Sequence, residues 1–390
     1  MAGTTGYRDT NTVESTIQQR EIRTAILKYD ADATPLLVLT NNIGGGSKVT
    51  VNPKFEWYDE DREVRRDTST TASTGPTTLA VTDGTRWHKD EVWVNTRTGE
   101  GFRVSSVSSN NVTVVPNIGG AGSVATLSGD EYLKVGVSKM EGDTELPAFG
   151  NNPTQRFNYT QIFERTWAMT RTAKNTANYT NPHDWDERKQ RAMYEFKIDK
   201  EAAYLWGPGP ARDTSGTHPR TLTRGIRPSI TTNVKDFGGT VTEAEFWDGF
   251  DAAFRYSNSD KAKVAISGRT PAAVIGGFPR GKLETIQADN DTTYGLSVLR
   301  YRHVFGTLNF LIHNLFSDST EYADEVMILD MQGSGGNTLV RERYLANSEM
   351  IVDDNVQENG RDGQMGKVLC ESGIELGLEK NHALWKNMGA

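Results

Sequence analysis

The sequence predicts a mixed α+β fold in which a long two-stranded β-ribbon carries a small all-β insertion. Two strand-like segments, 48–61 and 151–173, have apolar residues at the even spacing of half-buried strands. Between them, the stretch 76–137 consists of short apolar pairs separated by turn residues, which is typical of a small sandwich or barrel. A long helical pattern and then alternating helices and strands follow, and these indicate an α+β protein.

The ribbon itself predicts assembly. Its evenly spaced apolar residues are Val49, Val51, Phe55 and Trp57 in the outgoing arm and Phe157, Tyr159, Phe163 and Trp167 in the returning arm. Because an isolated two-stranded ribbon is marginal in water, we expect its apolar face to rest on another chain.

The same arms carry a family resemblance. The segments TPLLVLTNN at 34–42, FEWYDED at 55–61 and NYTQIF at 158–163 resemble the major capsid proteins of SU10-like tailed bacteriophages, which have the HK97 capsid fold. The resemblance runs through the first half of the chain and continues in element order to the C-terminus. It implies a non-enzymatic protein that self-assembles as hexamers and pentamers into the icosahedral head of a phage.

The resemblance also implies a division of the chain into parts. They are an N-terminal arm at 1–47, an extended loop (E-loop) at 48–75 and 138–173, the β-rich insertion at 76–137, a peripheral domain at 174–260 and 346–390 with a spine helix at 181–206, and an axial domain at 261–345. We expect the arm and the insertion to contact neighbouring subunits, the insertion as a bump on the outer surface.

Composition is ordinary for a soluble globular protein, and the resemblance implies that it is made in the host cytoplasm and ends in the virion. The 390 residues, 36% hydrophobic and 24% charged, are enough for about two or three compact units. No stretch approaches the roughly 20 apolar residues of a membrane span, and the N-terminus does not resemble a signal peptide. The lone Cys370 excludes an intramolecular disulfide and lies in an alternating apolar run, which predicts a buried strand cysteine.

The net charge of −8 limits what the chain binds. Tight, sequence-independent DNA binding needs clustered Lys and Arg, and the nearest approach to a basic run is 220–228. An acidic shell lets packaged double-stranded DNA slide, so we expect no sequence-specific binding. The resemblance implies a separate scaffolding protein and a portal as further partners, and the sequence does not decide whether a decoration protein binds.

Helices and strands are predicted from apolar periodicity and end signals. An amphipathic helix at 15–30 stops before Pro35. The long helix at 181–206 has Asn181 as cap, Pro182 at its first position and Gly207–Pro208 after its end. Further helices are predicted at 242–257 and from Thr270, and further strands at 261–267, 298–304, 308–314, 325–330 and 365–378.

The search for catalytic chemistry yields no site. The six histidines show no metal-ligand spacing, and no HExxH or G-x-S-x-G motif occurs, so we expect no enzyme activity, no cofactor and no metal. Without a secretory signal, the Asn-X-Thr sequons at Asn111, Asn158, Asn178 and Asn290 are chance matches. Some capsids of this fold join neighbours through Lys–Asn bonds; Lys54 is a conceivable donor, but no partner is matched.

A charged segment follows the outgoing arm. Acidic Asp59, Glu60, Asp61, Glu63 and Asp67 are interleaved with Arg62, Arg65 and Arg66. We interpret the segment as a solvated ribbon tip whose charges pair with a neighbouring subunit and set register. The predicted inter-subunit contacts are Phe55, Trp57, Asp59, Asp61, Arg62, Arg65, Arg66, Tyr159 and Phe163.

Two other functions stay open from the residues alone. The β-rich insertion suits a carbohydrate-binding or adhesive protein if Trp87 and Trp93 are exposed, although burial in a small core is favoured because Trp is highly buried on average. The second is a hydrolase whose site assembles from distant residues, since triads are recognised by geometry and not by sequence position.

Overall fold

A computed structural model of the chain describes residues 34–42, 47–61, 63–120, 124–142, 150, 152–176, 184–256, 262–277, 283–284, 298–333 and 337–389. The chain divides into two compact units. We call residues 1–59 with 155–390 the main body, and residues 60–154 the insert. The predicted helix at 15–30 lies outside the described residues.

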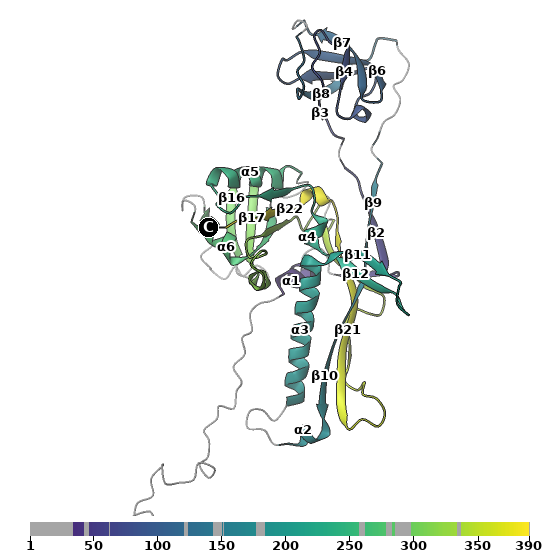
Figure 1. The fold of residues 1–390 in the computed structure, drawn as a ribbon, viewed down its shortest axis with the longest axis vertical. Helices are drawn as coiled ribbons and strands as arrows, with labels where there is room; N and C mark the ends of the chain where they lie inside the picture. Colours follow the sequence, from purple (N-terminus) through teal and green to yellow (C-terminus); the bar gives the residue numbers. More distant parts are fainter. Residues whose placement is uncertain are drawn as a thin grey trace, which may run out of the picture. The chain divides into compact units, whose positions relative to one another are not determined.

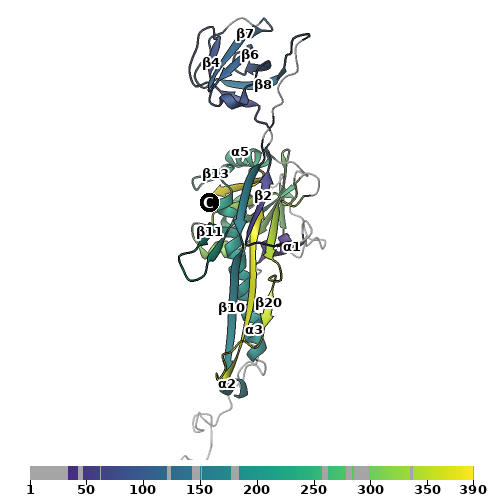
Figure 2. The same ribbon diagram turned by 90° about the vertical axis from the view of Figure 1, so that its right-hand side faces the viewer.

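The main body is organised around a five-stranded sheet with the order β1-β19-β21-β10, in which β20 also pairs with β21. Its strands are β1 (Lys48–Thr50), β10 (Gln161–Thr170), β19 (Val340–Leu345), β20 (Ile351–Asp353) and β21 (Gly363–Leu376). The long helix α3 (Asp184–Trp206) runs along β10 and β21 (Figures 1 and 2), and the short helix α2 (Arg171–Asn175) follows β10.

The structure corrects the predicted long ribbon. Among the described residues, only β2 (Lys54–Asp59) and β9 (Thr154–Tyr159) pair as a two-stranded arm, whereas β1 pairs in parallel with β19 and β10 pairs with β21. Phe163 and Trp167 do lie on the buried face of a strand, as their spacing predicts, but they pack in the core of the main body. The spacing cannot distinguish a partner sheet in the same chain from a second chain.

The long helix is confirmed, from Asp184 to Trp206; its predicted first residues, Asn181 and Pro182, lie outside the described part of the chain. The helix ends against a hairpin formed by β11 (Pro208–Asp213) and β12 (Arg220–Arg224). At Gly207 a Cβ atom would lie 2.6 Å from the carbonyl oxygens of both Ala203 and Thr223. Glycine is needed here because helix and strand backbones meet at this point.

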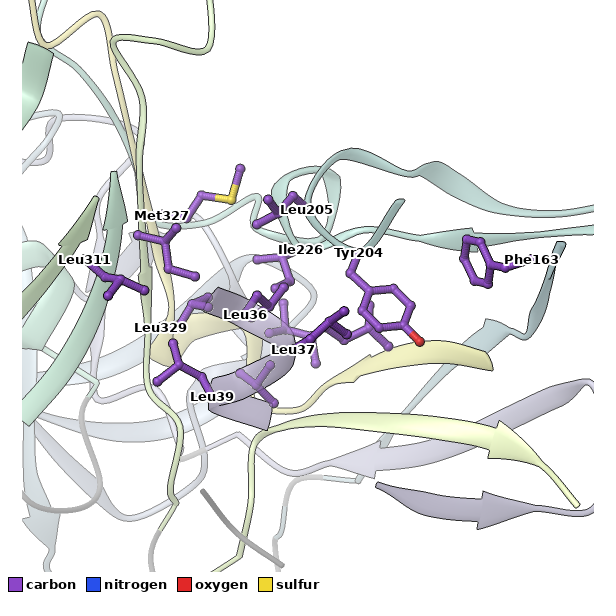
Figure 3. Close-up of a cluster of buried hydrophobic side chains, with 14 of the residues drawn as sticks. Leu36, Leu37, Leu39, Phe163, Tyr204, Leu205, Ile226, Leu311, Met327 and Leu329 are labelled. Atoms are coloured by element: carbon purple, nitrogen blue, oxygen red, sulfur yellow. The ribbon is translucent and has the colours of Figure 1, made fainter. Parts of the chain in front are cut away.

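The segment TPLLVLTNN forms a helix, α1 (Pro35–Asn42). Pro35 therefore begins a helix, which suits its fixed φ and missing N–H. The leucines of α1 pack into the larger core of the main body with side chains from α3, from α4 (Ile226–Ser229) and from the second sheet (Figure 3). The labelled members of this core are Leu36, Leu37, Leu39, Phe163, Tyr204, Leu205, Ile226, Leu311, Met327 and Leu329.

A second sheet of the main body has seven strands in the order β13-β22-β18-β14-β17-β16-β15. They are β13 (Val234–Asp236), β14 (Ala262–Ser267), β15 (Leu283–Glu284), β16 (Val298–His303), β17 (Gly306–Ile312), β18 (Val326–Leu329) and β22 (Ala383–Lys386). Helix α5 (Glu243–Phe254) starts with a capping box of Thr242 and Glu245, and its Phe246 packs on Tyr301 and Trp385. Helix α6 (Arg269–Gly276) follows β14, so the predicted elements of this region are confirmed to within a few residues.

The strands of the two sheets alternate along the sequence. The domain boundary predicted at residue 345 therefore does not separate the two sheets. β19 falls within the range 261–345 but lies in the five-stranded sheet, and β22 falls within 346–390 but lies in the seven-stranded sheet. Strand pairing between distant segments produces this exchange, and local sequence patterns carry no information about it.

The insert is an antiparallel sheet of six strands in the order β3-β8-β5-β6-β7-β4. They are β3 (Arg66–Thr68), β4 (Thr78–Ala80), β5 (Glu91–Asn95), β6 (Gly101–Ser108), β7 (Asn111–Ile118) and β8 (Glu131–Val137). A bridge between Ser69 and Val81 joins the two outer strands and closes the sheet into a barrel. Because β3 pairs with β8, the barrel begins before the predicted boundary at Pro76.

The barrel core is aromatic. Trp87 and Trp93 are 2% and 0% exposed and stack with ring centroids 4.0 Å apart, and Phe102 and Tyr132 pack around them. The favoured prediction that both tryptophans fill a small core is confirmed. These two rings therefore do not offer the exposed platform that a carbohydrate-binding module would need.

Candidate assembly surfaces

Asn158 fixes the root of the β2–β9 arm. Its side chain is buried, and its amide nitrogen donates to the carbonyl oxygens of Ile374 at 2.7 Å and Arg224 at 3.0 Å and to the Thr223 hydroxyl at 3.2 Å. Its amide oxygen accepts from the Arg224 backbone N–H at 2.8 Å. One side chain thereby joins the arm to both β12 and β21.

This contact set gives the NYTQIF segment a physical role. Thr160, two residues on, is also buried; its hydroxyl donates to Glu371 at 2.8 Å and its backbone N–H donates to the carbonyl of Pro53. From the sequence, Asn158 was recognised as a sequon asparagine and as the first residue of the NYTQIF segment, but not as a buried contact. The available signal was a polar pair, Asn158 and Thr160, at strand spacing within an aromatic segment, where buried polar groups need partners.

Several aromatic side chains of the arm are exposed. Tyr58 is 68% exposed and Phe157 is 42% exposed, while Trp57 and Tyr159 are partly exposed. Lys54 pairs with Glu56 and lies over the Phe157 ring, 4.6 Å from its centroid. Exposed aromatic side chains on a rigidly rooted strand pair are typical of an interaction surface.

The prediction that the charged segment 59–67 forms a single solvated ribbon tip is wrong. Asp67 is 3% exposed and accepts a 2.8 Å hydrogen bond from the Trp87 indole, so it belongs to the barrel. Asp59 accepts from the Leu378 backbone N–H at 3.1 Å, at the base of the arm. Burial of a carboxylate requires such donors, and a charge-rich sequence does not reveal which carboxylates have them.

The remaining predicted contact residues fall into three groups. Asp61, Arg65 and Arg66 are exposed, and Arg66 lies 3.4 Å from Glu131 of the barrel. Phe55 and Phe163 are each 6% exposed, so their side chains already have partners within the chain. Arg62 lies outside the described residues.

A buried carboxylate connects three parts of the main body. Glu201 of α3 accepts from the backbone N–H groups of Leu36 at 2.6 Å and Leu37 at 2.9 Å, and from the Nε2 of His313 at 3.0 Å. Glu201 and His313 are both fully buried. The interaction fixes the first turn of α1, the point at which the N-terminal segment joins the main body.

The clusters of titratable groups in the described residues are structural. Glu63, His88 and Glu91 approach one another closely enough for a metal ion, but the Lys134 ammonium lies 2.5 Å from a carboxylate oxygen of each glutamate. The Lys134 ammonium therefore takes the place that a metal ion would need between the two glutamates. Burial raises the pKa of the Cys370 thiol, which lies fully buried in β21 as predicted, so it is a poor nucleophile.

Two of the cavities formed by the described residues are small and lie at the ends of the five-stranded sheet. One, at the base of the arm beside Trp57 and Arg224, has a volume of about 40 Å³, and the other, beside Met169 and Asp362, has about 100 Å³. Substrate pockets usually have about 300–1,000 Å³. Among the described residues, no helix is long and apolar enough to cross a membrane.

A long helix packed along paired strands, an exposed two-stranded arm and a second sheet domain define a structural subunit of the HK97 capsid type, which confirms the predicted fold class. The model of the SU10 major capsid protein family matches residues 4–389, and the chain belongs to that family. It is a major capsid protein of a tailed phage, a structural protein of the virion and not an enzyme.

The following relatives are similar to this chain at low sequence identity. The major capsid protein of Pseudomonas phage PaMx41 is 23% identical over 372 residues, which cover 90% of this chain and 88% of that protein. A solved structure from Mycobacterium phage Bobi has a TM-score of 0.49 and 8% identity over 98% of this chain and 99% of that chain. The capsid structure of cyanophage P-SCSP1u has a TM-score of 0.46 and 9% identity over 97% of both chains.

Proposed function

We propose that this capsid protein forms hexamers and pentamers of an icosahedral head in which the β2–β9 arm of each copy lies on a neighbouring copy. In this proposal the arm and its flanks are the E-loop, α3 is the spine helix, and the seven-stranded sheet forms the axial domain at the centre of each capsomer. The N-terminal arm leaves from the first turn of α1 and reaches a further copy.

The observation that carries the proposal is a rigid root beneath an exposed apolar arm. The hydrogen bonds that the Asn158 amide nitrogen donates at the root are 2.7–3.2 Å long. The Tyr58 side chain, farther along the same arm, is 68% exposed. An arm that is fixed at its base loses little conformational freedom when a neighbour covers it, so more of the burial free energy is retained for assembly.

The proposed contacts lie on the arm and at the start of the insert. The exposed and partly exposed ones are Trp57, Asp59, Asp61, Arg65, Arg66 and Tyr159, as predicted from the sequence, with Tyr58 and Phe157 as further candidates from the structure. Arg62 stays a predicted contact outside the described residues. Phe55 and Phe163 support the arm from inside the same chain and are left out.

The proposed partners are further copies of the chain, a separate scaffolding protein, a portal and packaged double-stranded DNA without sequence-specific binding. The net charge of −8 supports weak contact with the duplex, because an acidic wall repels phosphates. Synthesis in the host cytoplasm belongs to the same proposal, and so does a place on the outer surface for the insert.

The test is particle formation by a double variant, Tyr58→Asp with Phe157→Asp, in the full chain expressed with its scaffolding partner. Negative-stain microscopy and light scattering should show shells or capsomers from the unchanged chain and only free subunits from the variant. Leu222→Asp is the matched control, because Leu222 is 42% exposed on β12 and lies outside the proposed contact. Normal shells from the double variant would show that the arm does not carry assembly.

A further inference from the structure

The outward face of the insert barrel carries a flat apolar surface, which we call the barrel face. Strand register places its residues in two rows that cross β8, β5, β6 and β7. One row is Leu133, Val94, Gly101 and Ile118, and the other is Gly136, Val92, Arg103 and Val115. Leu133, Val115 and Ile118 are 43%, 40% and 36% exposed, and Val92 and Val94 are partly exposed.

The composition of the barrel face is unusual for a surface that faces only water. An outward strand face is normally polar, whereas Arg103 is the only charged residue of the two rows within β8, β5, β6 and β7, and the glycines leave the surface flat. The first row continues into β3 at Arg66, which already lies 3.4 Å from Glu131. Within the described part of the chain, Arg103 has no ion-pair partner. Contiguous exposed apolar residues of this kind mark an interaction site, and a lone cation among them favours a partner with a carboxylate.

Among the described residues, the main body offers an exposed apolar segment with that chemistry, Glu349–Asp353, which we call the acidic strand. Met350 is 51% exposed and Ile351 is 37% exposed, and they lie between the exposed carboxylates of Glu349 and Asp353. Ile351 and Asp353 are held in β20 by pairing with Leu369 and Lys367 of β21. Neither flanking carboxylate has an ion-pair partner among the described residues.

Two other exposed apolar groups of the main body lie beside basic residues, whereas Ile162, which is 58% exposed and pairs with Glu371, is a single apolar side chain in β10. Val304 and Phe305, at the turn between β16 and β17, follow Arg302, and Val49 and Val51 lie between Lys48 and Lys54. Arg103 would repel either group across an interface, because like charges that face each other cost free energy.

We propose that the barrel face of one copy binds the acidic strand of a second copy, with Arg103 placed against Glu349 or Asp353. This contact rests on the proposed function, since it requires copies held side by side in a shell. It assigns the insert a defined docking site on a neighbour. The contact is heterologous, because it joins two different surfaces. The barrel face of each copy binds the next copy, and its acidic strand is bound by the previous copy. Repetition of such a contact can close into a ring.

Disulfide trapping tests the contact in assembled particles of the full chain. The single native cysteine is fully buried in β21, so introduced cysteines report without background. Val115→Cys with Met350→Cys should form disulfide-linked ladders of two, three and more copies, because a disulfide requires Cα atoms within about 7 Å. Val115→Cys with Val304→Cys is the matched control and should stay monomeric. No ladder in normal particles, or a disulfide that leaves the chain at monomer size, would overturn the contact.

Charge exchange tests the role of Arg103. Arg103→Glu and Glu349→Arg should each reduce the yield of closed shells, and the double variant should recover it. Lys139→Glu makes the same charge change at an exposed site of the insert outside the two rows and should leave the yield unchanged. An equal loss in Arg103→Glu and Lys139→Glu, or no recovery in the double variant, would overturn the pairing.

Different results would contradict the proposed function and this contact. If the unchanged chain forms no particles with its scaffolding partner, the proposed function is wrong. If it forms particles, and Arg103→Glu forms them equally well, only this contact is wrong. Binding of the barrel face to a different protein would appear as a loss of that protein from otherwise normal Arg103→Glu particles, and it would also overturn the contact.

Discussion

The insert and the main body place their buried polar groups in different ways. In the insert, buried carboxylates bond to residues of the same small barrel: Asp67 accepts from Trp87, and Asp130 accepts from Asn95 and Arg97. In the main body, Asn158 and Glu201 bond to segments far away in sequence. The insert is therefore a self-contained unit, whereas the main body depends on a few contacts that join separate segments.

The largest expected effect tests the self-contained insert. Trp93→Ala removes a fully buried ring that stacks on Trp87, so we expect it to destabilise the barrel by about 3–5 kcal/mol. Hydrogen exchange followed by mass spectrometry should show lost protection in 60–154 and unchanged protection in the main body. Leu133→Ala, on the exposed side of the barrel, is the control. Equal loss of protection in both units would contradict the division.

The next effect tests the dependence of the main body on single contacts. Asn158→Ala leaves the carbonyl oxygens of Ile374 and Arg224 without their donor, and each unsatisfied buried group costs about 1–3 kcal/mol. We expect a loss of roughly 3 kcal/mol in the unfolding free energy of the main body, measured by denaturant titration. Asn52→Ala is the matched control, because Asn52 is an exposed asparagine of the main body. A neutral Asn158→Ala would show that the arm is rooted by other contacts.

A third effect concerns pH and belongs to the main body alone. Burial, together with the nearby Lys263 ammonium, lowers the pKa of His382 from an ordinary 6.5 to about 4. Between these pH values the unfolded imidazole binds a proton and the folded one does not, so stability falls as pH falls from 6.5 to 4. The loss should approach roughly 3 kcal/mol near pH 4. Thermal unfolding across this range should have a shallower pH slope in His382→Gln, and an unchanged slope would contradict the assignment.

The local patterns of the sequence predicted elements well because each element obeys a local rule. Phenylalanines every four residues and a Thr–Glu capping pair specify α5, and alternation specifies the buried face of β10. The fold type and the family were predicted from the resemblance of three short segments. One of them, NYTQIF, contains Asn158 and Thr160, the buried polar pair at the root of the arm. The aromatic core of the insert was likewise predictable, because small barrels have few other places for a tryptophan.

The partners of these elements were not predictable from the same patterns. Nothing near Phe163 indicates that β10 pairs with β21, more than two hundred positions later in the sequence, and nothing near Asp67 indicates that its carboxylate is buried under Trp87. Long-range pairing and the satisfaction of buried polar groups are properties of the whole chain. The barrel face was missed for the same reason, since its two rows become visible only when strand register is known.

The smallest expected effect separates intrachain stability from assembly at one residue. Arg66 and Glu131 are both exposed and 3.4 Å apart, and such surface pairs contribute about 0–1 kcal/mol. Arg66→Ala and Glu131→Ala should therefore each change the unfolding free energy of the insert by less than about 1 kcal/mol. Both variants remove the same ion pair, but only Arg66→Ala also removes a proposed contact with a neighbouring copy. Lower shell yield in Arg66→Ala than in Glu131→Ala would assign Arg66 to the interface, and equal yields would restrict it to the barrel.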